Sequence, residues 1–128
     1  MPHRLKSPLV TPLASLADLD VALARSFTSP IVIFKHSSTC GLGAMAAAEV
    51  ADMLEGSDID ADVYVVDVHA GRAVSNAIAE RLKVRHESPQ ALVVQDGAVR
   101  WHKSHAAIRA ASIARALDEL RTSATRSS

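Results

Sequence analysis

Apolar residues recur along this chain at two spacings, and the spacing separates helices from strands. Apolar side chains three or four residues apart share one face of a helix. That spacing predicts four helices, over residues 15–26, 43–55, 72–83 and 105–121. The first opens with a capping pattern, with Ser15 as the cap and Asp18 in the first turn. Its apolar face would be formed by Leu16, Leu19, Leu23 and Phe27.

The second and fourth helices carry their own start and stop signals. Residues 43–55 are rich in alanine, which favours helix formation, and Gly56 is a suitable C-terminal stop. Ser104 is the predicted cap of the fourth helix. The expected apolar faces are Ala46, Val50, Met53 and Leu54 in the second helix, and Ile113, Ala116, Leu117 and Leu120 in the fourth.

Four short runs rich in β-branched residues predict strands, over residues 31–34, 63–66, 90–95 and 98–103. The first run is apolar at every position, which is typical of a strand covered on both faces in a parallel or mixed sheet. Asp96 and Gly97 between the last two runs predict a tight hairpin. In the final strand apolar and polar residues alternate, so one of its faces should be wetter.

The elements follow the order α-βαβ-α-ββ-α, which predicts an α/β fold with a four-stranded mixed sheet flanked by helices. This arrangement is thioredoxin-like, with an extra N-terminal helix. A length of 128 residues favours a single domain. Residues 1–14 hold three prolines and no helical spacing, so we expect an extended arm there. The domain would cover residues 15–121, and the Ser/Thr-rich residues 122–128 would form a flexible tail.

Charge and composition narrow the class of partner. Acidic and basic residues balance at 14 each, and aromatic residues are only 3% of the chain, so neither a nucleic-acid surface nor a set of base-stacking platforms is expected. No apolar run is long enough to span a membrane. The basic N-terminus lacks the apolar run of a signal peptide, and the chain has one cysteine, which together favour the reducing cytoplasm.

Cys40, the single cysteine, is the main candidate for chemistry. It has no partner for an intrachain disulfide, and it lies where a predicted strand gives way to a predicted helix. Backbone N–H groups and the positive end of a helix favour a thiolate there, and Lys35 and His36 add nearby positive charge. Gly41 and Gly43 would let other groups approach the sulfur. The plainer alternative is an inert buried thiol.

The remaining candidates near Cys40 also have two interpretations. Lys35 either attracts a carboxylate or the thiolate, or is a solvated strand end. His36 is either a proton carrier or an ordinary loop histidine. Thr39 and Ser38 either donate to the sulfur or shape the turn. Residues 41–43, Gly41-Leu42-Gly43, do not make a phosphate loop, because the Lys-Ser/Thr of such loops is missing.

The histidines do not predict a metal site. His102 is expected on a strand and His105 on a helix, so their three-residue separation does not put them on one helix face. No second cysteine or acidic cluster completes a tetrahedral set around them or around His86. We therefore expect no bound metal.

Several short segments together resemble the monothiol bacilliredoxin family. The matching residues are 34–40 with Cys40 at the end, 72–76, 78–80, 86–90 and 104–105. The resemblance implies a thioredoxin-like enzyme that removes bacillithiol, a small cysteine-bearing sugar thiol, from proteins held as mixed disulfides. Bacillithiol would be a co-substrate, and no tightly bound cofactor is implied. The expected partners are S-thiolated proteins and a low-molecular-weight thiol, and the expected state is a monomer or weak dimer.

The same resemblance gives roles to a second segment. In this arrangement Cys40 faces Pro89, and the Ser88–Pro89 bond is cis. The backbone of Ser88 would then pair with an extended thiol ligand, with Gln90 completing the loop. The alternative for Pro89 is a proline that simply starts a strand, a position that strands tolerate.

The turn after the cysteine keeps other functions open. The family usually continues with Pro-x-Ser, whereas this chain continues with Gly41, Leu42 and Gly43. That turn is similar to the Cys-Gly-Phe-Ser turn of monothiol glutaredoxins, some of which carry iron–sulfur clusters. One alternative is therefore a cluster-bridged dimer that carries iron and sulfur. Another is a thioredoxin-fold adaptor with a silent cysteine.

Overall fold

The computed structural model describes residues 10–36, 50–56, 59–104 and 108–127. Within these ranges it contains five strands and three long helices, and residues 50–54 form a further short helical segment. The strands are β1 (Val10–Pro12), β2 (Ile31–His36), β3 (Asp62–Asp67), β4 (Gln90–Gln95) and β5 (Ala98–Ser104). The long helices are α1 (Leu16–Arg25), α3 (Arg72–Leu82) and α4 (Ala110–Ser127).

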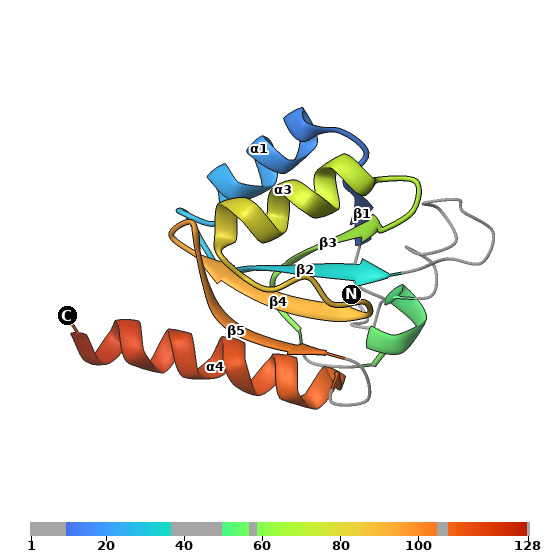
Figure 1. The fold of residues 1–128 in the computed structure, drawn as a ribbon. Helices are drawn as coiled ribbons and strands as arrows, with labels where there is room; N and C mark the ends of the chain where they lie inside the picture. Colours follow the sequence, from blue (N-terminus) through green and yellow to red (C-terminus); the bar gives the residue numbers. More distant parts are fainter. Residues whose placement is uncertain (1–9, 37–49, 57–58, 105–107, 128) are drawn as a thin grey trace, which may run out of the picture.

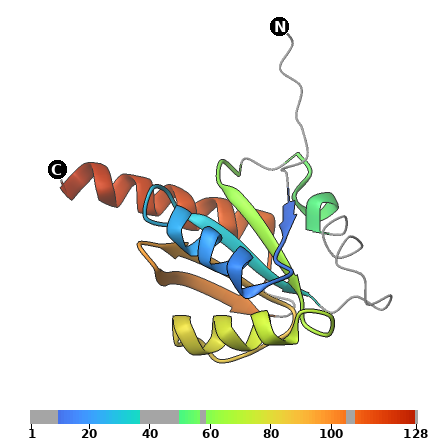
Figure 2. The ribbon, with the colours of Figure 1, turned by 90° about the horizontal axis from the view of Figure 1, so that it is seen from above.

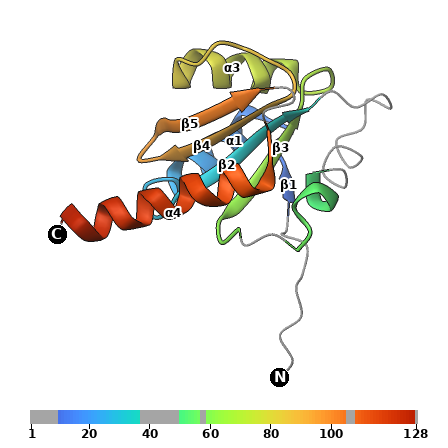
Figure 3. The ribbon, with the colours of Figure 1, turned by 90° about the horizontal axis from the view of Figure 1, so that it is seen from below.

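The strands form one mixed sheet in the order β1-β3-β2-β4-β5. Strands β1, β3 and β2 are parallel, whereas β4 runs antiparallel to β2 and β5 antiparallel to β4. Helices α1 and α3 cover one face of the sheet, and α4 and the segment 50–54 lie on the other (Figure 1). Figures 2 and 3 show these two faces in turn, from above and from below. The expected α/β architecture with a mixed sheet is confirmed.

The alternation of side chains along the strands divides the core in two. Successive residues of a strand point to opposite faces, so a strand that is apolar throughout supplies both layers. Ile31 and Ile33 of β2 pack in the layer under α1 and α3, and Val32 and Phe34 pack in the layer under α4. Every residue from 31 to 34 is buried, which explains the unbroken apolar run.

The predicted count of four strands is wrong, because residues 10–12 add a fifth. Val10 is in register with Val63 and Pro12 with Val65, so this part of the predicted arm is an edge strand beside β3. An edge strand has one neighbour, so a proline that cannot donate a hydrogen bond is tolerated at Pro12. The Leu13 N–H continues the pairing by donating to the Val65 carbonyl at 2.8 Å.

Helix α1 matches its predicted start, but its apolar face is shorter than predicted. Ser15 and Asp18 form the expected reciprocal capping box. The helix ends at Arg25, so Phe27 lies beyond it and is 65% exposed, and Leu16 is 44% exposed. Leu19 and Ala22 are the buried residues of α1.

Helix α4 begins and ends later than predicted. Ser104 is not its cap, because it is the last residue of β5 and lies in register with Gln90. The helix runs from residue 110 to residue 127, through most of the segment predicted as a tail. The predicted helix over 43–55 is described only from residue 50, and Gly56 follows it with a φ of +78°, as a C-terminal stop requires.

The hairpin turn has the conformation that its sequence predicts. Asp96 and Gly97 both have positive φ, of 55° and 75°, as a tight turn between β4 and β5 requires. Helix α3 ends at Leu82, and the C-cap residue Lys83 that follows it has a left-handed backbone conformation. In the part of the chain that the structure describes, no helix is both long enough and apolar enough to cross a membrane.

Candidate active site

The described site residues meet at one end of the strands, which is called the sheet edge below. There β2 and β3 end and β4 begins. Lys35 lies in register with Gln90, and His36 with Asp67. The Val68 N–H donates to the His36 carbonyl at 3.0 Å, which ties the two strand ends together. Residues 37–49 follow His36; Cys40, with Thr39, Gly41, Leu42 and Gly43, therefore lies outside the described residues.

The Ser88–Pro89 segment lies at this same edge. The Ser88–Pro89 peptide bond is cis, in agreement with what the resemblance implied, and β4 begins with the next residue. Since Gln90 is paired with Lys35, the proline is brought next to the end of β2. The structure thus places Lys35, His36, Ser88, Pro89 and Gln90 together.

Lys35 is fully buried, which rules out the solvated strand end considered above. Its Nζ lies 3.1 Å from Nδ1 of His86. Burial disfavours the charged ammonium and lowers the pKa of Lys35 from 10.5 to about 8. The side chain is therefore still mostly protonated at neutral pH, and a buried positive charge lies in the strand that leads to Cys40.

The contact with Lys35 determines the tautomer of His86. An ammonium group can only donate, so Nδ1 of His86 accepts and the ring proton resides on Nε2. The Oγ of Ser75, which is buried in α3, is 3.5 Å from the same Nδ1. Nδ1 of His86 thus faces Lys35 of β2 and Ser75 of α3, whereas Nε2 is a donor.

Two buried polar atoms near the cis bond have no hydrogen-bond partner among the described residues. They are Oγ of Ser88 and Oε1 of Gln90. The other end of the Gln90 amide is satisfied, because its Nε2 donates to the Arg85 carbonyl at 3.0 Å. Buried polar atoms are normally paired, so these two mark a place where a further polar group would be stabilising.

An apolar hollow of about 200 Å³ lies beside Pro89. His36 and Val50, the described residues on either side of the segment that carries Cys40, both line it. The other lining residues are Phe34, Lys35, Met53, Pro89 and Ile108. This hollow can accept an apolar or extended group next to the strand end.

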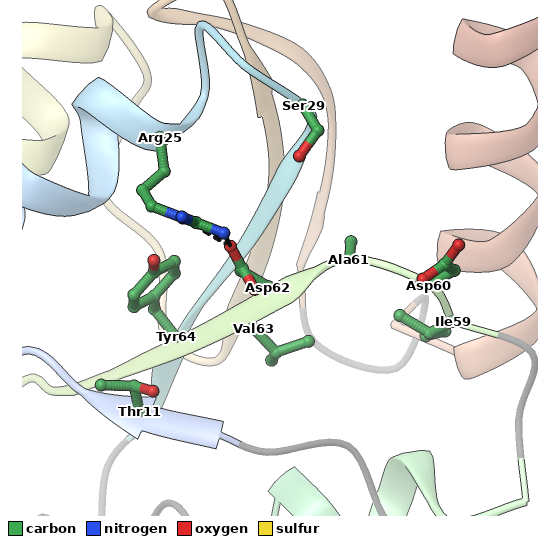
Figure 4. Close-up of a pocket in the computed structure, with 9 residues that line it drawn as sticks. All are labelled: Thr11, Arg25, Ser29, Ile59, Asp60, Ala61, Asp62, Val63 and Tyr64. Atoms are coloured by element: carbon green, nitrogen blue, oxygen red, sulfur yellow. Dashed lines mark hydrogen bonds and ion pairs between the residues drawn. The ribbon is translucent and has the colours of Figure 1, made fainter.

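A larger hollow, of about 400 Å³, lies at the opposite end of the parallel strands, where β2 and β3 begin. Figure 4 shows Arg25 reaching across it to Asp62, beside Tyr64; the Arg25 Nη2 to Asp62 Oδ2 distance is 2.6 Å. The hydrogen bond and charge of Asp62 raise the pKa of Arg25, and burial raises that of Tyr64. The cation here is already neutralised by its partner.

Sequence reasoning did not predict the partners of Lys35. His86 belonged to the segment 86–90 that resembles the family, and Ser75 to the segment 72–76, but nothing in the local pattern joined either to a lysine. Within the described ranges, no group of three or more His, Cys, Asp or Glu side chains could hold a metal ion.

The fold and this sheet edge define the class of protein. A solved structure titled as a candidate oxidoreductase with a thioredoxin fold matches 84% of this chain and 93% of its own, with 30% identity and a TM-score of 0.67. A thioredoxin variant from Halobacterium salinarum (16% identity, TM-score 0.60) covers 91% of this chain and 95% of its own. Thioredoxin O2 from Arabidopsis thaliana (19% identity, TM-score 0.61) covers 91% and 98%. The chain thus has the thioredoxin fold and is similar to thiol oxidoreductases.

A comparison with models of protein families places the chain in one family within this class. The family model described as monothiol bacilliredoxin BrxC matches residues 11–113. The chain belongs to the monothiol bacilliredoxin family.

Proposed function

We propose that this protein is a cytoplasmic monothiol disulfide exchanger that removes bacillithiol, or a similar low-molecular-weight thiol, from S-thiolated proteins through Cys40. The family match over residues 11–113, which includes the chain's only cysteine, carries this proposal. Further support comes from the sheet edge, where Pro89 and an apolar hollow adjoin the residues that flank the Cys40 segment.

The exchange proceeds by attack of the Cys40 thiolate on the bacillithiol sulfur of a mixed disulfide. The bond between the bacillithiol sulfur and the substrate protein breaks, and the released protein thiolate takes a proton from water. A disulfide between Cys40 and bacillithiol forms, so one disulfide replaces another without net oxidation. The buried cation of Lys35, five residues before Cys40, favours the ionised sulfur.

The second half of the cycle needs a thiol from outside the chain. Position 43, where a dithiol enzyme would hold its resolving cysteine, is Gly43. A second low-molecular-weight thiol, or a thiol of another protein, must therefore attack the bacillithiol sulfur of the adduct, which releases a disulfide between the two and regenerates the Cys40 thiolate. One sulfur per site suffices, so a monomer or weak dimer can carry out the cycle without a bound cofactor.

The test is intact mass spectrometry of the protein after incubation with oxidised bacillithiol, glutathione or coenzyme A. We expect a one-to-one adduct with bacillithiol, and release of free thiol from a bacillithiolated protein at a rate that rises with added small thiol. Cys40→Ser should abolish adduct and turnover, because a hydroxyl is not ionised near neutral pH. Activity retained by Cys40→Ser, or no adduct with any small thiol, would contradict the proposal.

The monothiol mechanism makes a separate prediction about Gly43. In Gly43→Cys, an internal thiol becomes available to resolve the adduct, provided that the two sulfurs can meet. The steady level of adduct should then fall relative to the wild type, measured by intact mass at equal small-thiol concentration. Gly43→Ala is the matched control and should leave the adduct in place.

A further inference from the structure

Besides the apolar hollow beside Pro89, a second hollow lies at the same edge of the sheet and is lined mainly by polar residues. The exchange step does not use it. It has a volume of about 300 Å³ and is formed by the start of α3, the loop before it and the loop that follows it. It adjoins the end of β2 directly, since Val68 is one of its lining residues and donates to the His36 carbonyl. The lining residues are Val68, His69, Arg72, Ser75, Asn76 and His86.

This hollow is lined by donors and cations. None of the described lining residues is acidic. Arg72 and Asn76 are one helical turn apart and so lie on one face of α3, and both are exposed. Because the Lys35 ammonium donates to Nδ1 of His86, the ring proton is on Nε2, which is therefore a donor. Two acids adjoin lining residues along the chain, Asp67 before Val68 and Glu87 after His86, but neither lines this hollow. Oδ1 of Asp67 accepts from the His69 and Ala70 N–H groups, and Asp67 lines a different, smaller hollow.

The position of Arg72 is unfavourable for the helix itself. It is the first residue of α3, where the positive end of the helix repels a cation. The first turn carries no acidic residue, and the Gly71 cap offers no side chain to the free N–H groups. No hydrogen bond or ion pair to the Arg72 side chain occurs among the described residues. A cation and an uncapped helix start at one hollow, with buried Ser75 beside them, are together suited to an anion.

We propose that the hollow formed by Arg72, Asn76, Ser75 and His86 binds the ionised acid group, a carboxylate or phosphate, of the low-molecular-weight thiol. This inference rests on the proposed exchange function and names its co-substrate class, an acidic thiol. Arg72 supplies the charge, and Asn76 and His86 supply neutral donors. The site orients the small thiol at the sheet edge where the segment with Cys40 begins, and it discriminates against neutral thiols.

A matched pair of substrates tests this directly. The same carrier protein is modified with glutathione or with glutathione diethyl ester, which differ in the charge of the carboxylates, and kcat/KM is measured for each. We expect Arg72→Met to lower the acid-to-ester ratio of kcat/KM about tenfold, the size of one lost charge-assisted hydrogen bond, mainly through KM. Arg72→Lys should recover part of the ratio. Bacillithiol and coenzyme A substrates then distinguish a preference for carboxylate from one for phosphate.

Arg115→Met is the matched control. Arg115 is an exposed arginine on α4, on the other face of the sheet, and its replacement should leave the ratio at the wild-type value. An unchanged ratio in Arg72→Met would overturn the inference while leaving the exchange function intact. Failure of the wild type to release thiol from any of these substrates would instead count against the exchange function.

A binding measurement makes the inference independent of turnover. S-methylglutathione cannot exchange, so it is titrated into the full-length protein while the NMR signals of the Asn76 side-chain amide are followed. We expect saturable shifts with the acid, and no comparable shifts with its diethyl ester or in Arg72→Met. Absence of shifts with the acid would refute the site whatever the exchange assay shows.

Discussion

Lys35 lies in a strand whose four preceding residues are all apolar and buried, and it is itself completely buried. A charged lysine in such a place is costly unless it is paired. The neutral imidazole of His86 accepts from it but carries no compensating charge. The lowered pKa of Lys35 follows from this desolvation. The cost is consistent with a functional position, since such perturbed groups gather at active sites.

The buried ammonium predicts a pH-dependent stability. Between pH 8 and 10.5 the unfolded chain holds the Lys35 proton more tightly than the folded one, so the free energy of unfolding should rise with pH in this window. The full gain is about 3 kcal/mol at roughly 1.4 kcal/mol per pKa unit. Lys35→Met should lack this rise.

Urea denaturation of the two proteins at pH 7, 8, 9 and 9.5 provides the measurement. Both should carry Cys40→Ser, so that the thiol does not titrate. The upper limit stays below the ionisation of Tyr64. Parallel profiles for the two proteins would show that Lys35 does not carry its proton as described.

At the scale of elements, the turn between β4 and β5 is hydrogen-bonded to Ser26, the residue that follows α1. The Asp96 N–H donates to the Ser26 carbonyl at 2.8 Å, and the Gly97 N–H donates to Oγ of Ser26 at 3.0 Å. Ser26 is fully buried, and its own hydroxyl donates a hydrogen bond to the Leu23 carbonyl at 2.6 Å. The ring of Phe27 lies against Gly97, which explains why this residue leaves the helix face that its spacing suggested.

Gly97→Ala should therefore destabilise the protein. Its φ of +75° disfavours alanine, and an added Cβ would lie 2.8 Å from Cζ of Phe27. We expect a loss of about 1–2 kcal/mol in the free energy of unfolding. Asp96→Asn is the matched control, because asparagine tolerates positive φ at this turn position. Equal stability of Gly97→Ala and wild type by urea denaturation would contradict this account of the turn.

At the scale of the molecule, the two ends of the parallel strands carry different features. One end gathers Lys35, His36 and the cis bond, and the other has the Arg25–Asp62 ion pair over the hollow of about 400 Å³. Both side chains of that pair are well exposed, and exposed pairs contribute little to stability. The sheet separates this pair from the proposed exchange site.

Arg25→Ala should accordingly leave exchange intact. We expect kcat/KM on a bacillithiolated protein to stay within about twofold of the wild type, because an exposed and neutralised cation contributes no field at the other end. The assay is the release of protein thiol used above. A large loss of kcat/KM without loss of folding would reveal coupling between the two ends.

Local patterns were sufficient for most of the fold. The capping box of α1, the buried run of β2 and the Asp96–Gly97 turn each depend on neighbours within a few residues, so the sequence could specify them. The same holds for the α/β class and for Gly56 as a helix stop. The resemblance to the family, carried by short segments around Cys40 and Pro89, is confirmed by the family match.

Tertiary structure decided what depends on residues far apart in the chain. Residues 10–12 become strand β1 only because they pair with the edge of β3, and the three prolines of residues 1–14 had predicted an extended arm there instead. Lys35 and His86 are 51 residues apart, and no local spacing could have paired them. The hollow at Arg72 likewise needs two loops and a helix start to meet. The sequence by itself determined the elements and the single thiol, whereas packing determined which charges are buried and what surrounds them.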